Sequence, residues 1–334
     1  MTIPKVTILI INYNEPELTF DCLNALKKQI FKDFDIVLVD NGSSHELVNA
    51  LKKFISQMHL KITFLPLSVN LGFSGGNNKA LEKSTGKYIA LLNNDALPEP
   101  NWLAELVSAM DADPEIGACA SKILVYNSDI IDSAGDGFLR SLKGYKRGEG
   151  EDKNKFSKKE YVFGACAAAV LYRKKMIEEI GFLDEDFFLI HEDTDFNFRI
   201  QLAGWKVLYI PDAIVYHKVR SSIKRHSYTE TFYTMRNSYL LKIKSIPLSI
   251  LIYCLPEVLI SIFMEFLYFC IKHRQLKLYF RAIGSAIILM PIMLKKRKFI
   301  LKTRKVDNKY LLKMMNPVLG KGVLRTKIKK FLYD

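Results

Sequence analysis

Cysteine is scarce in this sequence, and the few thiols follow no pairing pattern. They are odd in number, scattered, and without a Cys-x-x-Cys pair: Cys22, Cys119, Cys166, Cys254 and Cys270. Such a set argues against a disulfide framework or a zinc site and predicts buried, reduced thiols. The start of the chain also lacks the pattern of a signal peptide, because the apolar run at 5–12 is short and has no cationic leader. We therefore expect the N-terminal part in the cytoplasm.

The common phosphate-binding loops are missing as well. The glycines between positions 72 and 76 match neither the Walker A spacing nor the dinucleotide-binding spacing. This argues against an ATPase or a dehydrogenase. Gly75 and Gly76 are expected only to allow a tight entry into a helix.

Acidic residues are rare in the last third of the chain. The net charge is +14, but residues 1–217 hold 24 Lys and Arg against 30 Asp and Glu, a balance of −6. Residues 218–334 hold 25 against 5, a balance of +20. Because long aliphatic and aromatic runs accompany these cations, the pattern predicts an anionic membrane surface as the partner, and no nucleic acid.

Short apolar runs alternate with helical patterns through the first 217 residues. Strands are predicted at 5–12, 35–40, 62–67, 88–92, 116–123, 163–172, 205–210 and 213–217. Helices are predicted at 15–29, 45–56, 77–84, 102–110 and 174–180, with another starting near 192. The alternation predicts an α/β, Rossmann-like fold with a mostly parallel central sheet, helices on both faces, and ligands at the carboxyl ends of the strands. The polar, Gly-rich stretch 129–159 is expected to be a mobile excursion over the site or simply a long loop.

An acidic cluster follows a bulky apolar run at 187–190. Glu192, Asp193 and Asp195 lie within four positions at the start of an amphipathic helix, where the helix dipole favours carboxylates. Capping of the helix is the ordinary explanation for such a cluster. A functional role gains support from two other polar features at predicted strand ends, the turn 93–95 and His217.

The order of these motifs is recognisable. The motifs are IINYN at 10–14, VDNGS at 39–43, NLGF at 70–73, LNND at 92–95, Glu192-Asp193 with Arg199, and Gly204-Trp205 with His217. The series resembles the inverting glycosyltransferases of family 2, which have the GT-A fold, and looks most like the branch containing rhamnosyltransferases of bacterial polysaccharide assembly. It covers roughly residues 5–240, and six motifs in the right order are a specific signal.

The resemblance implies a nucleotide-sugar site. Tyr13 would lie against the base of a dTDP- or UDP-sugar, and Asp40 would accept a hydrogen bond from N3–H of thymine or uracil. A role in the turn is the alternative for Asp40. The remaining donor-binding residues implied are Asn12, Asn14, Asn70, Gly72, Phe73, Asn93 and Asn94.

The resemblance also implies a divalent cation, Mg²⁺ or Mn²⁺, bridging the donor diphosphate. Asp95 and His217 would be its protein ligands. Asn93 stands where the family more commonly has the first carboxylate of Asp-x-Asp. A single carboxylate predicts weak metal binding in the absence of the nucleotide.

For catalysis, the resemblance implies Asp193 as the general base that takes the proton of the acceptor hydroxyl in a direct displacement. Glu192 would orient the acceptor or the base. Asp195 is expected to cap the helix, and Arg199 to pair with it at i, i+4.

The last third of the chain predicts helices at a membrane. A helix at 228–245 carries Arg236-Asn237, which resembles a recurrent pair closing the catalytic domain. Two apolar stretches follow, at 245–271 and 282–294. The first has a polar stripe, Glu257, Ser261 and Glu265, that a helix lying in the interface would keep wet. A basic run at 295–298 is expected to clamp anionic lipid. A buried helical hairpin and a membrane-spanning helix are the alternatives.

Two domains are therefore predicted, a catalytic domain at 1–240 and a membrane-associating helical region at 241–334. The expected function is an inverting glycosyltransferase, peripheral or monotopic on the cytoplasmic face of the membrane, that moves a sugar such as rhamnose to a lipid-linked or polysaccharide acceptor. A sugar nucleotidyltransferase is one alternative, although residues 11–16 lack its Gly-rich loop. A degenerate sugar-nucleotide-binding scaffold is another, and Asn93 favours it.

Overall fold

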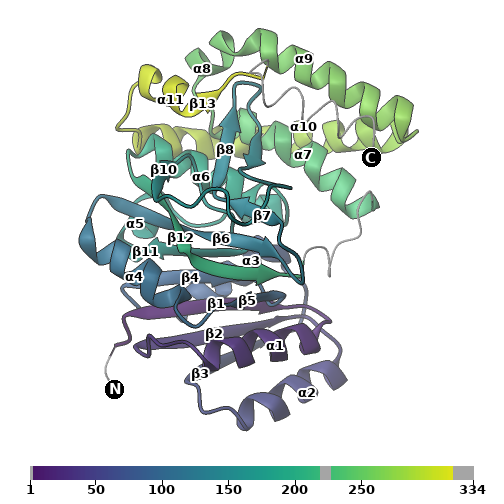
Figure 1. Cartoon of the computed structure of the whole chain (residues 1–334). Helices are drawn as coiled ribbons and strands as arrows, with labels where there is room; N and C mark the ends of the chain where they lie inside the picture. Colours follow the sequence, from purple (N-terminus) through teal and green to yellow (C-terminus); the bar gives the residue numbers. More distant parts are fainter. Residues whose placement is uncertain (1–2, 219–226, 319–334) are drawn as a thin grey trace.

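The computed structural model describes residues 3–218 and 227–318 (Figure 1). In this part of the chain, a ten-stranded sheet has the order β10-β12-β6-β11-β4-β1-β2-β3, with β5 on β12 and β7 on β6. Its strands are β1 (Val6–Asn12), β2 (Phe34–Asn41), β3 (Ile62–Leu67), β4 (Tyr88–Leu92), β5 (Ala96–Pro98), β6 (Ile116–Val125), β7 (Ile131–Ala134), β10 (Glu160–Val162), β11 (Ala169–Arg173) and β12 (Lys206–His217). The neighbours β3, β2, β1 and β4 pair in parallel, as do β6 and β12, while β11 runs antiparallel between the two groups.

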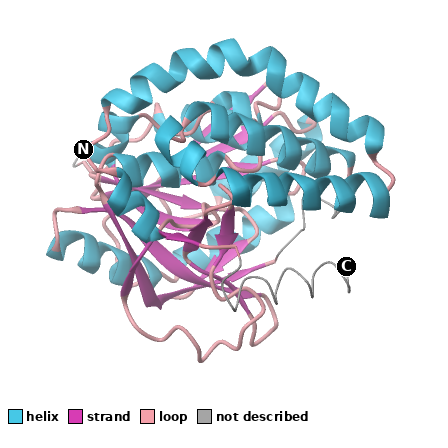
Figure 2. Cartoon of the chain, turned by 90° about the horizontal axis from the view of Figure 1, so that it is seen from above, coloured by secondary structure: helices cyan, strands magenta, loops and turns pink. Residues whose placement is uncertain are grey.

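Helices cover both faces of the sheet. They are α1 (Pro16–Lys27), α2 (His45–Ser56), α3 (Gly72–Leu81), α4 (Trp102–Ala112), α5 (Lys174–Ile180), the short η1 (Glu185–Phe187), α6 (Glu192–Leu202), α7 (Tyr228–Lys244), α8 (Leu248–Tyr253), α9 (Leu255–Phe266), the π-helix η2 (Leu267–Lys272), α10 (Leu276–Lys302) and α11 (Asn308–Met314). Figure 1 shows α8 to α11 gathered at one end of the molecule, opposite α2. Seen from above in Figure 2, helices cover much of the sheet.

The core follows from the alternation of side chains along buried strands. On β1, Ile8 and Ile10 pack in one apolar cluster and Leu9 in another, on the opposite face of the sheet. A third cluster joins Phe198 of α6 to Leu240 of α7 and Met293 of α10. The C-terminal helices are therefore packed against α6 through shared apolar side chains. The predicted division of the chain at residue 240 stays a prediction.

Most predicted helices and strands are present at the positions that the apolar pattern indicated, and the differences have local causes. The helix predicted at 77–84 starts at Gly72, because the Asn70 side chain accepts the N–H of Gly72 (2.7 Å) and satisfies the first turn. The strands predicted at 205–210 and 213–217 are one strand, β12, with a bulge between Ile210 and Ile214. All five cysteines are free, as predicted.

The expectation of a long loop at 129–159 is wrong. This stretch contains β7, then β8 (Asp136–Leu139) and β9 (Gly144–Lys146), which form a small sheet with β13 (Met315–Asn316) in the order β13-β8-β9. Strands of three or four residues are too short to show an alternating pattern. The strand predicted at 163–172 also begins only at Ala169.

The expectation that Asp195 caps helix α6 is wrong as well. Its carboxylate is fully buried and accepts hydrogen bonds from Arg199 (2.9 Å), Lys244 (2.7 Å) and Ser245 (2.6 Å). The predicted pair with Arg199 is thus present. Burial opposes ionisation, but Lys244 and Arg199 hold the pKa of Asp195 below its usual value. Lys244 also contacts Asp184 (2.7 Å), so one ammonium links two buried carboxylates.

The basic run at 295–298 is not a continuous lipid clamp. Lys296 pairs with Asp184 and, at 2.8 Å, with Asp186, and the Arg297 guanidinium donates to the carbonyl of Ile243 (2.9 Å). These two side chains face the protein because carboxylates and a carbonyl lie beneath them. Lys295 and Lys298 remain exposed.

The polar stripe of α9 faces the protein and not water. Glu257 accepts the N–H of Val318 (2.7 Å), Ser261 is buried, and Glu265 pairs with Lys143. Its carboxylates bond to groups inside the fold, whereas the predicted interfacial helix would expose them to water. The opposite, apolar side of the helix is consequently turned outward.

This outward side extends over α8, α9 and α10. Large apolar side chains are exposed along it, with Ile288 at 77% and Phe263 at 61%, together with Leu248, Ile252, Leu259, Ile271, Phe280, Ile287 and Phe299. Helix α10 is long and apolar enough to cross a membrane by length and composition, and 28% of its most apolar window is buried in the protein. Large apolar side chains exposed in this number indicate an interaction surface.

Replacing Lys244 by Met should destabilise the fold by about 3–5 kcal/mol, because it leaves the buried Asp195 and Asp184 short of a counter-charge. The matched control is Lys296→Met, whose partly exposed side chain contributes about 1 kcal/mol or less. Urea unfolding in detergent measures both. The pKa of both carboxyls is lowered in the fold, so the Lys244 contribution should shrink as the pH falls below about 4. Equal losses in the two variants would contradict this assignment.

Candidate active site

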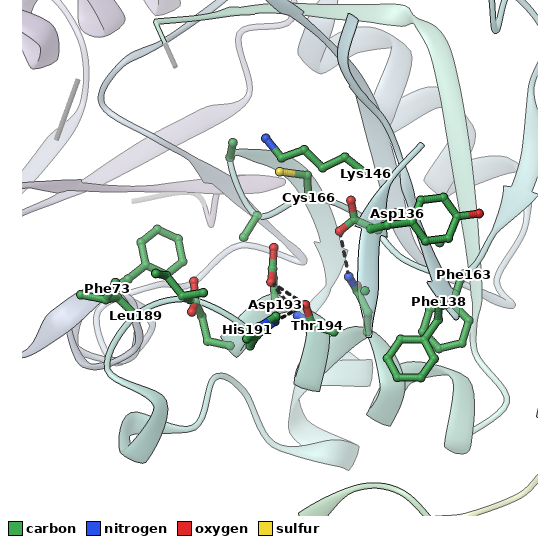
Figure 3. A pocket seen from close by; sticks show the side chains of 18 of the residues that line it. Phe73, Asp136, Phe138, Lys146, Phe163, Cys166, Leu189, His191, Asp193 and Thr194 are labelled. Atoms are coloured by element: carbon green, nitrogen blue, oxygen red, sulfur yellow. Dashed lines mark hydrogen bonds between the residues drawn. The ribbon is translucent and has the colours of Figure 1, made fainter. Parts of the chain in front are cut away.

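The carboxyl end of β4, the end of β12 and the start of α6 meet at a cavity of about 440 Å³. Of the site residues predicted from the sequence, five line it: Phe73, Asn93, Glu192, Asp193 and His217. The others lie around this cavity or beneath its walls. Figure 3 shows the side chains of Asp193 and Asp136 directed into this space from different elements.

Asp40, at the end of β2, is fully buried. Its carboxylate accepts the Asn12 amide (2.7 Å) and the N–H of Ser43 (2.9 Å), and Asn12 in turn accepts the Thr19 hydroxyl (2.9 Å). These contacts fix the turn after β2, which is the structural alternative weighed for Asp40. The contact with a nucleotide base stays a prediction.

Tyr13 and Asn14 lie on the rim of this turn. The Tyr13 side chain is 45% exposed, which leaves its ring available for stacking on a base. Asn14 has φ +57°, and its N–H donates to the Ser43 hydroxyl (2.8 Å). Asn94 has a supporting role, because its amide donates to Thr19 (3.3 Å) beneath the site.

The loop before α3 is held by side-chain amides. Asn41 donates to Asn70 (3.1 Å) and to the carbonyl of Gly72 (3.0 Å). Gly72 has φ +72°, and a Cβ there would lie 2.4 Å from the carbonyl oxygen of Phe188. Only glycine fits this approach, which brings the predicted donor loop against the turn that precedes the acidic cluster.

Asp95 and His217 meet at the end of β12. His217 Nε2 lies 3.2 Å from Asp95, and its Nδ1 lies 3.0 Å from Asp132. Burial opposes the charge, but the hydrogen bonds with Asp132 and Asp95 raise the pKa of His217 to about 9. Lys146 (2.7 Å) and His217 lower the pKa of the buried Asp132 to about 2.

This pair fits a divalent cation in part. A carboxylate and an imidazole whose other nitrogen is held by a second carboxylate are a common arrangement around metals. Among the described residues, no group of three or more His, Cys, Asp or Glu could hold a metal alone. The oxygens of a bound diphosphate would have to complete the coordination, as the single carboxylate at 95 predicts.

In two carboxyls of the acidic cluster, Glu192 and Asp193, burial opposes ionisation. Burial and the neighbouring Asp193 raise the pKa of Glu192 to about 8. Burial also raises the pKa of Asp193, although it accepts the N–H of Thr194 (2.6 Å). Glu192 Oε2 is buried and has no hydrogen-bond partner among the described residues. Such an atom is ready to contact a ligand.

The turn before α6 has an unusual backbone. Phe188, Ile190 and His191 have φ values of +64°, +67° and +70°, a region that side chains other than glycine rarely adopt. The amide of Asn237 donates to the carbonyls of Phe187 (2.8 Å), Leu189 (2.8 Å) and Ile190 (2.7 Å).

Arg236 adds bonds to the carbonyls of Asp186 (2.6 Å) and Phe187 (3.0 Å). The Arg236-Asn237 pair that the sequence singled out therefore clamps the strained turn on which the acidic cluster stands.

The sequence did not indicate the far wall of the cavity, which comes from β8 and β9. Asp136, Tyr145 and Lys146 line it, and the Asn197 amide of α6 donates to Asp136 (3.3 Å). Burial and Asp193 raise the pKa of Asp136 well above its usual value. Asp136, Tyr145 and Lys146 lie in the stretch 129–159, which was expected to be a mobile excursion or a long loop. The only available signal was its mixture of aromatic and charged residues.

Known proteins match this chain in sequence. The family model described as Glycosyl transferase family 2 matches residues 7–181. The O-antigen biosynthesis protein RfbC of Myxococcus xanthus is 25% identical over 69% of this chain and 18% of its own length. The poly-beta-1,6-N-acetyl-D-glucosamine synthase of Staphylococcus epidermidis is 21% identical over 65% of this chain and 51% of its own length. The chain thus spans about half or less of these two relatives.

Solved structures match the fold. S. aureus TarS 1-349 in complex with UDP-GlcNAc superimposes with a TM-score of 0.58 and 17% identity, over 90% of this chain and 89% of that one. The mannosyltransferase PcManGT from Pyrobaculum calidifontis, in complex with GDP-Man and Mn²⁺, gives 0.54 and 17% over 91% and 86%. At these identities the likeness concerns the fold alone. With the family match, it leads to one conclusion: the chain has the predicted GT-A fold and belongs to glycosyl transferase family 2.

Proposed function

We propose that this protein is an inverting glycosyltransferase that moves a sugar from a nucleotide-diphosphate donor to a hydroxyl of a lipid-linked or polysaccharide acceptor, in cell-surface glycan synthesis. One observation carries the proposal. Asp193 and His217, which is bonded to Asp95, line the same cavity although they come from different elements. The cavity thus has a basic carboxylate on one wall and a diphosphate-binding pair on another.

Asp193 acts as the general base. The acceptor oxygen attacks the anomeric carbon, its proton passes to the Asp193 carboxylate, and the bond from that carbon to the diphosphate breaks on the opposite side. The diphosphate leaves with the electron pair. Attack and departure on opposite faces invert the anomeric centre.

Asp95 and His217 would hold Mg²⁺ or Mn²⁺ together with the donor. When bound, the cation neutralises charge on the departing diphosphate. PcManGT binds GDP-Man with Mn²⁺, which supports a divalent metal here. For this chain we propose a UDP- or dTDP-sugar, with rhamnose as the first sugar to test.

The acceptor enters along an aromatic wall. Phe138 and Phe163 stack with ring centroids 4.8 Å apart at the cavity, and Tyr145 lies on the same side. Rings of this kind offer flat apolar faces and, in tyrosine, a polar edge, which suits a sugar. Glu192 is protonated at neutral pH and would donate to an acceptor hydroxyl.

The exposed apolar side of α8 to α10 supports a peripheral or monotopic position at the cytoplasmic face of the membrane. An amphipathic helix lies in the interface with its apolar side in the acyl region and its polar side against protein or water. The inward stripe of Glu257, Ser261 and Glu265 meets this description. A lipid-linked acceptor would remain in the bilayer while its saccharide reaches the cavity.

Asp193→Asn should lower kcat by roughly 10²–10⁴-fold, because the acceptor proton loses its receiver. Binding of UDP, measured by calorimetry, should stay unchanged. Asp129→Asn, at a carboxylate whose side chain is 73% exposed, is the matched control and should keep full activity.

A degenerate scaffold would show no turnover in any form, and a nucleotidyltransferase would release a sugar nucleotide from a sugar phosphate and a nucleoside triphosphate. Full transfer by the Asp193→Asn protein would refute the assignment of the base.

The pH dependence of kcat/KM for the acceptor should be determined by Glu192. Its pKa of about 8 means that the Glu192 carboxyl is protonated below that pH and can donate a hydrogen bond to the acceptor. Above that pH the carboxyl loses this proton, and its negative charge lies beside Asp193. The kcat/KM for acceptor should therefore fall as the pH rises through about 8. Glu192→Gln stays neutral and should lack this fall while remaining active. A profile with the same alkaline fall in both proteins would exclude Glu192 as its origin.

A further inference from the structure

A second cavity, of about 430 Å³, lies where the starts of α7 and α10 meet. Its described lining is Tyr228, Arg274, Gln275, Lys277, Leu278 and Arg281. It shares no described lining residue with the catalytic cavity. Three of the six side chains are cations and none is an acid, so the cavity carries a concentrated positive charge.

The three cations are not engaged by carboxylates of the described residues 3–218 and 227–318. No ion pair joins Arg274, Lys277 or Arg281 to an acid there, and the Arg281 guanidinium instead lies over the Tyr228 ring at 5.7 Å. The buried Lys244, by contrast, pairs with Asp195. Unpaired cations converging on a hollow are the arrangement that binds phosphate oxygens.

Hydrogen bonds hold the backbone turn that carries Arg274, the first of these cations. Arg274 has φ +55° in the turn between η2 and α10. The turn is fixed on both sides, since His273 N–H donates to the carbonyl of Tyr268 (3.1 Å) and Gln275 N–H to that of Phe269 (2.8 Å). A rigid turn lowers the entropic cost of gathering the cations around an anion.

Exposed apolar side chains lie close in sequence to the three cations. Ile271 of η2 is 62% exposed, and Leu276 and Phe280 of α10, the helix that carries Lys277 and Arg281, are 48% and 58% exposed. A ligand bound here would have its anionic group in the cavity and an apolar chain against these residues. This combination is that of a phosphorylated lipid and not of a free nucleotide.

A row of aromatic rings runs from this cavity to the catalytic one. Tyr228 stacks with Phe232 (6.2 Å), Phe232 contacts Tyr233 (5.3 Å), and Tyr233 stacks on Phe188 (5.3 Å). Phe188 belongs to the strained turn whose next residues line the catalytic cavity. Tyr228 and Tyr233 are about 7.5 Å apart along α7, a short span for a saccharide.

We propose that the basic cavity binds the diphosphate of the prenyl-type lipid that carries the acceptor saccharide, and so places the saccharide end at Asp193. The inference rests on the proposed function and names its acceptor class. Three cations match the two or more charges of a diphosphate ester better than the single charge of a phosphodiester headgroup. The row of rings would guide the saccharide toward the catalytic cavity.

The test is binding of farnesyl diphosphate to the full-length protein in a neutral detergent, measured by calorimetry. Lys277→Gln with Arg281→Gln should weaken it at least tenfold. The matched control is Lys52→Gln with Lys53→Gln, on α2 at the opposite end of the molecule in Figure 1, and it should bind as the unchanged protein does. UDP binding and the melting temperature should be the same in all three. Unaltered farnesyl diphosphate binding in the Lys277/Arg281 variant would overturn the proposal.

Two further arms separate the possible sources of phosphate. Inorganic diphosphate should bind much more weakly than farnesyl diphosphate, and equal affinity would overturn the lipid assignment. Flotation with phosphatidylcholine vesicles containing phosphatidylglycerol should change little in the variant. A loss of vesicle binding with farnesyl diphosphate binding intact would instead indicate a phospholipid headgroup. Because each readout is binding, a failure of transfer activity would count against the proposed function without deciding this site.

Discussion

The arrangement of the site depends on one clamped turn. Three residues between 188 and 191 have left-handed backbone conformations, each costing on the order of 1–3 kcal/mol. Asn237 offsets this cost with a single amide that donates to three carbonyls of the turn, all from within α7. The clamp brings the carbonyl of Phe188 against Gly72 and leaves Glu192 and Asp193 directed into the cavity. The donor loop and the acidic cluster are thus positioned by the same short segment.

Helix α7 connects the catalytic cavity to the outward apolar helices. Its first turn lies at the basic cavity, its middle holds the clamped turn, and its last residue, Lys244, is anchored on Asp195 of α6 and Asp184. Helix α10 packs along it. A single helix therefore joins the packing of α10 to the start of α6. Three cations of the last third of the chain, Lys244, Lys296 and Arg297, bond within the fold, so its surface is less cationic than its sequence suggests.

Much of the fold was predictable because buried parallel strands are continuous apolar runs, and β1, β2 and β4 show this pattern clearly. The polar residues at their ends and the order of the motifs likewise predicted the family. The wall made by β8 and β9 was not predictable, since strands of three or four residues are too short to show an alternating pattern. Asp132, which holds His217, was missed for the same reason. The inward direction of Glu265 and Lys296 depends on partners more than 100 residues away, Lys143 and Asp184, and no local pattern records such pairs.

The central claim is geometric: Asp95 with His217 and Asp193 serve one bound nucleotide sugar. A crystal structure with UDP and Mn²⁺, located by its anomalous scattering, tests it most directly. The account predicts Mn²⁺ coordinated by the Asp95 carboxylate, by Nε2 of His217 and by the diphosphate, inside the cavity that Asp193 lines. Mn²⁺ and UDP bound together at another place, or held in this cavity without either protein ligand, would contradict it.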